Sequence, residues 1–341
     1  MTRKTSESIT IRDVAEQAGV SVATVSRYLN DSAPVSGEVG IRIQKVMTDL
    51  KYVPHAAARQ LASQKTMVIG LLLNNIYNDY FGPLLYGVES VVQQNGYNLL
   101  VATNRPNQHP PSYQPLGSHN VDGLLVFADS LNDEELLRLQ SRKMPTVLIH
   151  RSSPSGSDIP SVTVENKAAT YHLIDHLIKE HGRRRIVFVR GPVYQEDSYW
   201  REMGYRQALE AHAIPFDPDL ILTGDFEREV AYQSMKKFLS NGKSESFDAV
   251  FAGDDTAAVG VLDALKENNF RIPEDVAVVG FDDSLLSSFL IPALTTVKAP
   301  TYDVGRCAAE NLIRMLNRQV IENVTLLPTE LIIRNSCGCT G

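Results

Sequence analysis

The sequence has 341 residues, a formal net charge of −7 at neutral pH and three cysteines. Its basic residues are unevenly placed, because residues 1–65 hold nine Lys or Arg against six Asp or Glu, whereas residues 66–341 hold 24 against 34. This balance excludes a protein that binds nucleic acid or anionic membranes over its whole surface, and it suits a small basic module on an acidic body.

The first predicted element is a pair of short helices joined at a glycine. Thr10 followed three residues later by Asp13 is typical of a capping box and predicts the start of a helix. Gly19 can adopt the left-handed conformation that ends a helix, and Ser21 is expected to cap a second helix that ends near Leu29. Two helices this short, joined by so tight a turn, have the dimensions of a helix-turn-helix, whose second helix enters the DNA major groove. The alternative is an ordinary helical hairpin.

Two further helical patterns follow. Residues 36–50 predict a third helix, whose inward face consists of Ile43, Val46, Met47 and Leu50. Pro54 then opens a stretch of good helix formers that is too short to be a stable isolated helix in water. This stretch is either a helix that folds only against a partner or a solvated linker.

Beyond residue 66, short apolar runs alternate with amphipathic helical stretches. The runs begin at residues 68, 97, 121, 145, 185, 248 and 276. This alternation predicts parallel sheets in α/β layers, and about 276 residues exceed one comfortable core, which predicts two lobes. Residues 104–119 contain four prolines and are expected to form a loop.

Ordered blocks along almost the whole chain resemble the LacI/GalR family of bacterial transcription regulators. They include DVAEQAGVS, TVSRYLN, Y-x-P at residues 52–54, A-x-x-L-A at residues 58–62, VDGLLVF, PTVLIHR, FAGDDTAAVG, IPEDVAVVGFDD and LTTVKAP. The resemblance implies an N-terminal helix-turn-helix DNA-binding head at residues 1–53 and a hinge helix and linker at residues 54–65. It also implies that residues 66–341 form an effector-binding and dimerisation core with a two-lobed, periplasmic-binding-protein-like (type I) α/β fold.

In this family the chain crosses three times between the lobes. The resemblance therefore places lobe 1 at about residues 66–163 and 295–324, and lobe 2 at about residues 164–292 and 326–341. It implies a repressor of carbohydrate-utilisation genes whose operator binding is changed by a small effector. Because one short recognition helix contacts few bases, we expect a homodimer on a pseudo-palindromic operator in double-stranded DNA.

The resemblance also implies which residues contact DNA. Val22, Ala23 and Arg27 would meet base edges, and Leu61 would be the hinge leucine inserted into the minor groove. Val22 and Ala23 carry no hydrogen-bonding side chains, so they can read only thymine methyls and shape, which leaves Arg27 as the main polar reader. Residues 39–40 are Val-Gly where the family usually has a Thr-Arg pair that grips phosphate. The expected DNA-binding residues are Ser21, Val22, Ala23, Thr24, Ser26, Arg27, Arg59 and Leu61.

Polar side chains at the ends of apolar runs predict a ligand site in the cleft between the lobes, because ligands of such folds collect at the carboxyl ends of strands. Asp254 and Asp255 end one run, Asp282 and Asp283 end another, and a loop after a third leads to Trp200 and Arg201, all of them expected to face one cleft. Paired carboxylates could serve acid/base chemistry or metal binding, but with one arginine they also suit the hydroxyls of a sugar.

In the family, positions matching Arg201, Asp254 and Asp282 hold the effector, and an aromatic residue matching Phe226 stacks on it. The chain has Asp254 where Asn is usual and Asp79 where Pro is usual. Two carboxylates around one arginine favour a small neutral sugar or polyol; a nucleobase or a sugar phosphate acting as corepressor is the alternative. The expected effector-binding residues are Tyr80, Phe81, Arg201, Phe226, Asp254 and Asp282.

Neither an enzyme nor an exported binding protein is expected. The sequence contains no G-x-S-x-G, G-x-x-x-x-G-K-[ST] or G-x-G-x-x-G motif, so we expect no catalytic residue and no cofactor. It shows no signal peptide and no apolar run of membrane-spanning length, which predicts a cytoplasmic, nucleoid-associated protein without a membrane partner.

No metal site is expected either. His172 and His176 have the spacing of metal ligands on a helix, but the sequence places no third ligand beside them. Cys307, Cys337 and Cys339 are too few for a four-Cys zinc site, and Cys-Gly-Cys gives poor disulfide geometry, so reduced thiols are the plain interpretation.

Overall fold

The computed structural model describes residues 9–30, 33–52, 65–77, 79–104, 116–117, 119–240 and 247–340. The chain divides into two compact units, Met1–Met67 and Val68–Gly341, which are described separately. The predicted hinge helix, together with Arg59 and Leu61, and most of the predicted loop at 104–119 lie outside the described residues. Among the described residues, no helix is long and apolar enough to span a bilayer.

The first unit contains the three predicted helices, α1 (Ile11–Ala18), α2 (Val22–Asn30) and α3 (Gly37–Asp49). Their small core confirms the predicted apolar faces, since Val14, Ala15, Ala18, Val25 and Ile43 are all buried. The buried side chains of α1 and α2 meet Ile43 of α3, so none of the three helices would bury its apolar face alone.

The predicted caps of these helices also form. The Asp13 carboxylate accepts the backbone N–H of Thr10 at 2.6 Å and the Thr10 hydroxyl at 2.8 Å. Gly19 takes the left-handed conformation, with φ of 62°, and ends α1. Ser21 Oγ accepts the backbone N–H of Thr24 at 3.1 Å, as expected of a cap on α2. The turn between the two helices is therefore fixed by local chemistry.

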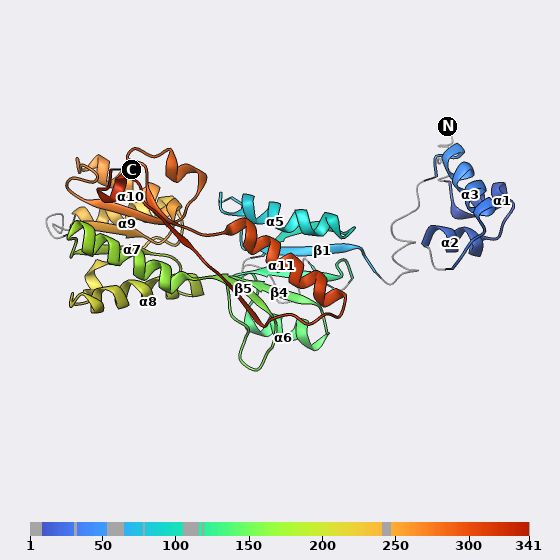
Figure 1. Ribbon diagram of the computed structural model, residues 1–341, viewed down its shortest axis with the longest axis horizontal. Helices are drawn as coiled ribbons and strands as arrows, with labels where there is room; N and C mark the ends of the chain where they lie inside the picture. The colour runs from blue at the N-terminus through green and yellow to red at the C-terminus, as the bar shows by residue number, and fades with distance from the viewer. Residues whose placement is uncertain are drawn as a thin grey trace, which may run out of the picture. The chain divides into compact units, whose positions relative to one another are not determined.

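The second unit contains two six-stranded sheets, and Figure 1 shows helices packed on both of them. The first sheet has the order β11-β5-β4-β3-β1-β2, with all neighbours parallel. Its strands are β1 (Val68–Leu73), β2 (Asn98–Thr103), β3 (Gly123–Phe127), β4 (Thr146–Ile149), β5 (Ser161–Val164) and β11 (Val324–Leu327). Its helices are α5 (Phe81–Gln94), α6 (Asp133–Ser141) and α11 (Thr301–Leu316).

The second sheet has the order β12-β10-β9-β8-β6-β7, and only the β10–β12 pair is antiparallel. Its strands are β6 (Ile186–Arg190), β7 (Ile221–Thr223), β8 (Ala249–Ala252), β9 (Ala277–Asp282), β10 (Thr295–Lys298) and β12 (Glu330–Ile332). Its helices are α7 (Asn166–His181), α8 (Glu196–Ala211), α9 (Arg228–Phe238) and α10 (Asp255–Glu267). Short 3-10 turns are η1 (Pro218–Leu220), η3 (Leu285–Ser288) and η4 (Asn335–Cys337).

The chain crosses three times between the sheets, as expected, but two crossings are displaced. Residues 295–298, expected in lobe 1, form β10, which pairs with β9 of the second sheet. Residues 326 and 327, expected in lobe 2, belong to β11 of the first sheet. The second crossing follows β10 because this strand pairs along its backbone with β9 and β12 of the second sheet, and the Thr296 hydroxyl adds a hydrogen bond to buried Asp255 at 2.6 Å.

A glycine sets the distance between α7 and α8, the helices that carry part of the candidate site. A Cβ atom at Gly204 would lie 2.3 Å from the carbonyl oxygen of Lys167, so no other residue fits at this crossing without a shift of the backbone. The close approach brings Arg201 of α8 beside Asn166 of α7, where they form a hydrogen bond.

Candidate functional site

A cavity of about 970 Å³ lies between the two lobes. All six residues expected to bind an effector line its wall: Tyr80 and Phe81 from the first lobe, and Arg201, Phe226, Asp254 and Asp282 from the second. The rule that ligand groups follow the carboxyl ends of parallel strands therefore brings these residues together, although they lie up to 202 positions apart in the chain.

Arg201 is held in place by the protein itself. Its Nε donates to Asn166 Oδ1 at 2.9 Å, one terminal nitrogen donates to the Gly253 carbonyl at 2.5 Å, and the other donates to Asp282 Oδ1 at 3.3 Å. The guanidinium lies 3.7 Å above the centroid of the Phe281 ring. With its residue only 4% exposed, Arg201 is a buried and preorganised cation on the cavity wall.

Burial destabilises the charged forms of the two carboxyl groups near Arg201, those of Asp254 and Asp282. Burial raises the pKa of Asp254 to about 7, and the charge of Asp282 adds to the increase. Burial also raises the pKa of Asp282 to about 6, although Arg201 opposes the shift. Asp254 Oδ1 accepts the backbone N–H of Ala257 at 2.8 Å and so caps α10. Hydrogen bonds donated by a ligand would stabilise the charged form of both carboxyl groups.

A chain of polar contacts that the sequence did not reveal joins the two lobes at the cavity. The Tyr80 hydroxyl lies 2.5 Å from His150 Nε2, and His150 Nδ1 lies 3.0 Å from Asp197 Oδ2. Asn166 Nδ2 then donates to Asp197 Oδ1 at 2.7 Å, and Asn166 also holds Arg201. Burial raises the pKa of Asp197, but His150 and Arg201 outweigh burial and leave it below its usual value.

The rule that ligand-binding residues follow the ends of parallel strands could have identified His150, because this residue directly follows β4. Asn166 and Asp197 lie in the first turns of α7 and α8, where a polar residue is ordinarily a capping residue, so no local signal distinguishes them. Burial, with the charges of Asp282 and Asp197, raises the pKa of Tyr80 well above its usual value, so its hydroxyl keeps its proton.

Backbone strain collects around the same cavity. Five non-glycine residues on its wall have positive φ: Ala128 (40°), His150 (59°), Asp225 (52°), Phe226 (57°) and Asp282 (108°). Such conformations cost roughly 1–3 kcal/mol each and persist where surrounding contacts enforce them, often at binding sites. A Cβ atom at Gly191 would lie 2.1 Å from the Phe226 ring, so this glycine makes room for the aromatic side chain.

The wall of the cavity is strongly acidic. Among the described residues that line it, two are arginines, Arg151 and Arg201. Nine are acidic: Asp129, Asp133, Glu134, Glu196, Asp197, Asp225, Glu227, Asp254 and Asp282. This arrangement repels anions and leaves many acceptors for hydroxyl or amine donors.

The expectation that both members of each Asp pair face the cleft is wrong. Asp255 accepts the Thr296 hydroxyl at 2.6 Å and the backbone N–H of Ser284 at 2.7 Å, and it does not line the cavity. Asp283 pairs with Arg334 at 2.7 Å. Adjacent residues at a strand end point to opposite sides, so one member of each pair reaches the cavity and the other stabilises the lobe. Trp200 lines a separate cavity of about 450 Å³.

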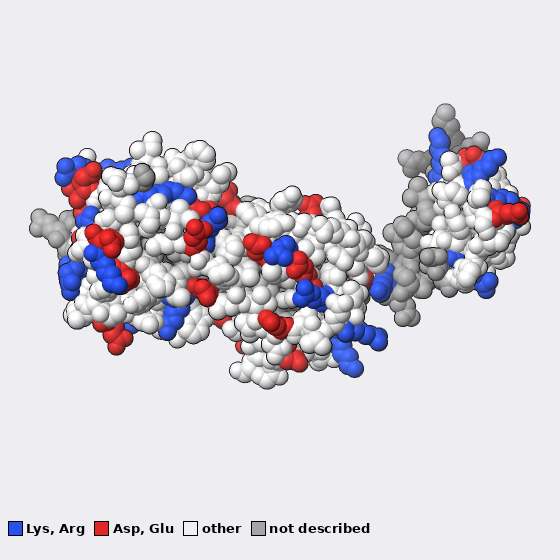
Figure 2. All heavy atoms as spheres, viewed as in Figure 1, with Lys and Arg blue, Asp and Glu red and all other residues white. Residues whose placement is uncertain are grey.

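In the first unit, the predicted recognition face lies on the outside of α2. Val22 is 41% exposed, Ser21, Ala23 and Arg27 are exposed, and Thr24 and Ser26 are half-buried. The hydroxyls of Ser21 and Thr24 form a hydrogen bond of 2.8 Å, so both also stabilise the turn. On the face in Figure 2, basic and acidic side chains of the second unit are interspersed rather than gathered in one patch. The exposed face of α2 is therefore the candidate DNA-contacting surface of the first unit.

The raised pKa of Asp254 predicts a pH-dependent stability. Between about pH 4 and pH 7 the Asp254 carboxyl binds a proton more tightly in the folded protein than in the unfolded chain, so its contribution to the free energy of unfolding falls as pH rises through this range. Asp254→Asn keeps a capping side chain and removes the charge. We expect the variant to melt roughly 2–6 °C above the parent at pH 8, with a smaller difference at pH 5, in thermal unfolding without ligand.

Asp275 is a control of opposite sign, because Arg271 lowers its pKa to about 2. Asp275→Asn should not raise the melting temperature at pH 8. If the parent protein has the same melting temperature at pH 5 and pH 8, and Asp254→Asn does not raise it at pH 8, the raised pKa of the Asp254 carboxyl is contradicted.

Two family models match the chain. The model described as bacterial regulatory proteins, lacI family, matches residues 10–55, which include α1, α2 and α3. The model described as periplasmic binding protein-like domain matches residues 174–337, which include all six strands of the second sheet.

Individual proteins match over nearly the full length. The HTH-type transcriptional regulator RegA of Clostridium saccharobutylicum is 34% identical over 331 residues, 96% of this chain and 98% of its own. A solved complex of the transcriptional regulator CelR with cellobiose is 28% identical, with a TM-score of 0.71, and covers 96% of this chain and 99% of its own. The Lac repressor dimer bound to operator and the anti-inducer ONPF is 25% identical, with a TM-score of 0.82, and covers 97% and 99%.

Proposed function

Because the chain belongs to the LacI family of bacterial transcriptional regulators, which bind DNA and are not enzymes, we propose that it represses carbohydrate-utilisation genes and releases its operator when a neutral, sugar-like effector enters the cleft. The observation that carries the proposal is the cavity in which Arg201, Asp254, Asp282 and three aromatic side chains meet. The protein would act in the cytoplasm, at the nucleoid.

The chemistry of the wall supports a polyol. Vicinal hydroxyls can donate to Asp254 and Asp282 and accept from Arg201, while the C–H face of a sugar ring covers an aromatic ring such as Phe226. Nine acidic residues against two arginines disfavour a phosphate or a sugar acid. The solved relative CelR was captured with cellobiose, which is an uncharged sugar.

Polar contacts at the cavity can couple ligand binding to the relative position of the two lobes. Tyr80 contacts His150 within the first lobe, the His150–Asp197 contact crosses to the second lobe, and Asn166 connects Asp197 to Arg201. A ligand that bonds to Arg201 and Asp282 would compete with or reinforce this chain of contacts, and so favour one arrangement of the lobes over another. Release of the operator is the expected consequence for an inducer.

The effector can be found by measuring melting temperatures against neutral sugars, polyols, nucleobases and sugar phosphates, followed by operator binding with each hit. We expect a neutral sugar or polyol to raise the melting temperature and to weaken operator binding. A hit restricted to a nucleobase or a sugar phosphate that tightens operator binding would overturn this proposal in favour of a corepressor.

We also propose that the chain works as a homodimer. Three large apolar side chains in the segment after β9 are exposed, Leu285 by 76%, Phe289 by 73% and Ile291 by 82%. Apolar side chains gathered in one exposed segment are typical of a protein interface. The related Lac repressor was solved as a dimer.

Sedimentation at micromolar concentration should give twice the mass of the chain. Phe289→Glu combined with Ile291→Glu should shift the equilibrium toward the monomer, because two charges would be buried in the interface. Val320→Glu, at a residue 96% exposed outside this segment, should leave the dimer intact. A parent protein that sediments only as a monomer would contradict the dimer.

A further inference from the structure

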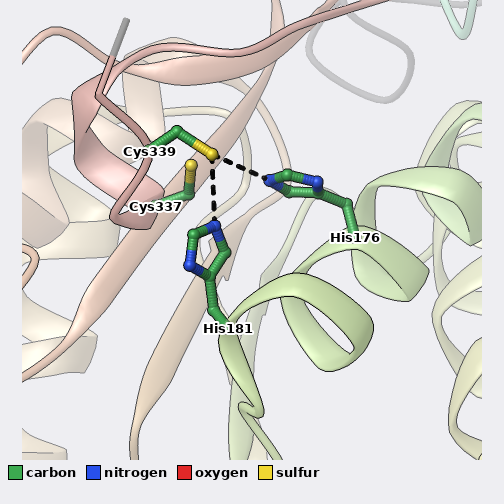
Figure 3. Close-up of side chains that lie close together, drawn as sticks. All are labelled: His176, His181, Cys337 and Cys339. Carbon is green, nitrogen blue, oxygen red and sulfur yellow. Dashed lines mark hydrogen bonds between the residues drawn. The ribbon is translucent and has the colours of Figure 1, made fainter.

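Four side chains with metal-binding atoms, none of which lines the cavity, meet in the second lobe (Figure 3). His176 and His181 come from α7, and Cys337 and Cys339 come from the segment that follows β12. One ligand atom from each residue lies within 4.8 Å of the ligand atoms of the other three. The sequence predicts no metal site here: His172 and His176 have helical spacing, but no third ligand is placed beside them, because Cys337 and Cys339, which lie beside His176, come from the other end of the chain.

The distances fit a single tetrahedral ion. Cys339 Sγ lies 3.8 Å from His176 Nε2 and 3.4 Å from His181 Nε2, and both rings turn this nitrogen toward the sulfur (Figure 3). In a tetrahedral zinc site with Zn–S of about 2.3 Å and Zn–N of about 2.0 Å, neighbouring ligand atoms are roughly 3.3–3.8 Å apart. Small side-chain movements would therefore suffice to place an ion between the four atoms.

The local backbone presents the four residues to a common point. His181 is the last residue of α7, which ends at Gly182 with φ of 65°. Gly338 has φ of 114° and lets the chain turn between the two cysteines. The Thr295 hydroxyl donates to Cys337 Sγ at 3.1 Å, as a second-sphere partner of a metal thiolate would.

We propose that His176, His181, Cys337 and Cys339 bind one Zn²⁺ ion in a closed, four-coordinate structural site. Two thiolates and two neutral imidazoles around Zn²⁺ give a site of zero net charge, which suits its half-buried position. Binding displaces the two thiol protons to solvent and changes no oxidation state. With four protein ligands, no coordination position remains for a substrate, so the role is structural.

The ion would fasten the C-terminal segment to α7. This segment already contributes to the second lobe, because the Ser336 hydroxyl donates to the Val278 carbonyl of β9 at 2.5 Å and Arg334 pairs with Asp283. β9 ends at Asp282 on the cavity wall. A zinc ion that joins residues 176 and 339 would therefore stabilise the lobe that carries Arg201 and Asp282, because the ion binds the four ligands together only in the folded lobe.

The test is metal binding by the full-length protein. After purification and incubation with Zn²⁺, followed by removal of free metal, we expect about one zinc per chain. Replacement by Co²⁺ should give intense visible bands of a tetrahedral ion and a sulfur-to-metal charge-transfer band. A strong chelator should lower the melting temperature, and Zn²⁺ should restore it. Less than a tenth of a zinc per chain, or a Co²⁺ spectrum without sulfur ligation, would overturn the proposal.

Matched variants separate this site from adventitious binding. Cys339→Ser and His176→Gln should each reduce zinc content at least tenfold under competition with a moderate chelator. Cys307→Ser and His172→Gln change a cysteine on α11 and a histidine on α7 outside the cluster, and both should keep one zinc per chain. Equal zinc content in all four variants would refute the assignment, and the Co²⁺ spectrum of the parent protein decides the question if a variant does not fold.

Discussion

Replacing Arg27 by alanine is expected to weaken operator binding by a factor between about 30 and 10⁴. A bidentate contact from arginine to guanine contributes about 1–3 kcal/mol, and a dimer loses it at two half-sites. Arg27 is exposed on α2, whereas Val25 on the opposite face is buried. Val22 and Ala23 offer no hydrogen bonds, and the short hydroxyl side chains of α2 cannot reproduce a two-bond contact to guanine, so this contact is not replaced.

The measurement is fluorescence anisotropy with operator and with random DNA over a range of salt concentrations. Arg42→Ala is a matched control, because Arg42 is an exposed arginine of α3 and its removal subtracts the same charge. Arg27→Ala should reduce the ratio of operator to random affinity, whereas Arg42→Ala should leave that ratio nearly unchanged. An equal loss on both DNAs for Arg27→Ala would show that Arg27 contacts phosphate and reads no base.

The elements that sequence reasoning predicted well are those whose signals are local. The caps at Thr10 and Ser21 and the left-handed Gly19 depend on residues within three or four positions, so the sequence alone suffices to place them. The rule about strand ends predicted Arg201, Asp254 and Asp282, because parallel strands bring their carboxyl ends to one edge. Tyr80, Phe81 and Phe226 were predicted separately, as aromatic candidates, and all six residues line the cavity.

The elements that sequence reasoning missed depend on contacts between distant segments. The pair His150–Asp197 joins the two lobes, and no spacing in the sequence announces it. Cys337 and Cys339 lie beside His176 and His181, which are more than 150 positions away in the sequence. Counting cysteines alone therefore did not predict the proposed metal site. The crossing after β10 was misplaced because backbone pairing with β9 and with β12, a strand later in the chain, holds that strand in the second lobe.

Removal of the Arg201 guanidinium should abolish most of the effector binding. Arg201 is fixed by Asn166, Gly253 and Asp282 before any ligand arrives, so the ligand gains a charged donor without ordering a flexible side chain. Loss of a buried charged donor that faces ligand oxygens costs about 3 kcal/mol or more, which corresponds to a more than 100-fold weaker affinity for Arg201→Ala.

Calorimetry with the effector found by the melting-temperature screen measures this loss of affinity. Two further variants, one at the site and one outside it, show whether the loss is specific to the cavity. Asp282→Asn removes the carboxylate that pairs with Arg201 and should weaken binding by roughly 1–3 kcal/mol, because ligand hydroxyls lose an acceptor. Arg206→Ala, about one and a half turns further along α8, removes an arginine that pairs with Glu202 outside the cavity and should bind normally. If Arg201→Ala and Asp282→Asn bind the effector as tightly as the parent protein does, the effector binds outside this cavity. If the effector proves to be an anion, the acidic wall does not exclude anions, and the assignment of a neutral polyol is wrong.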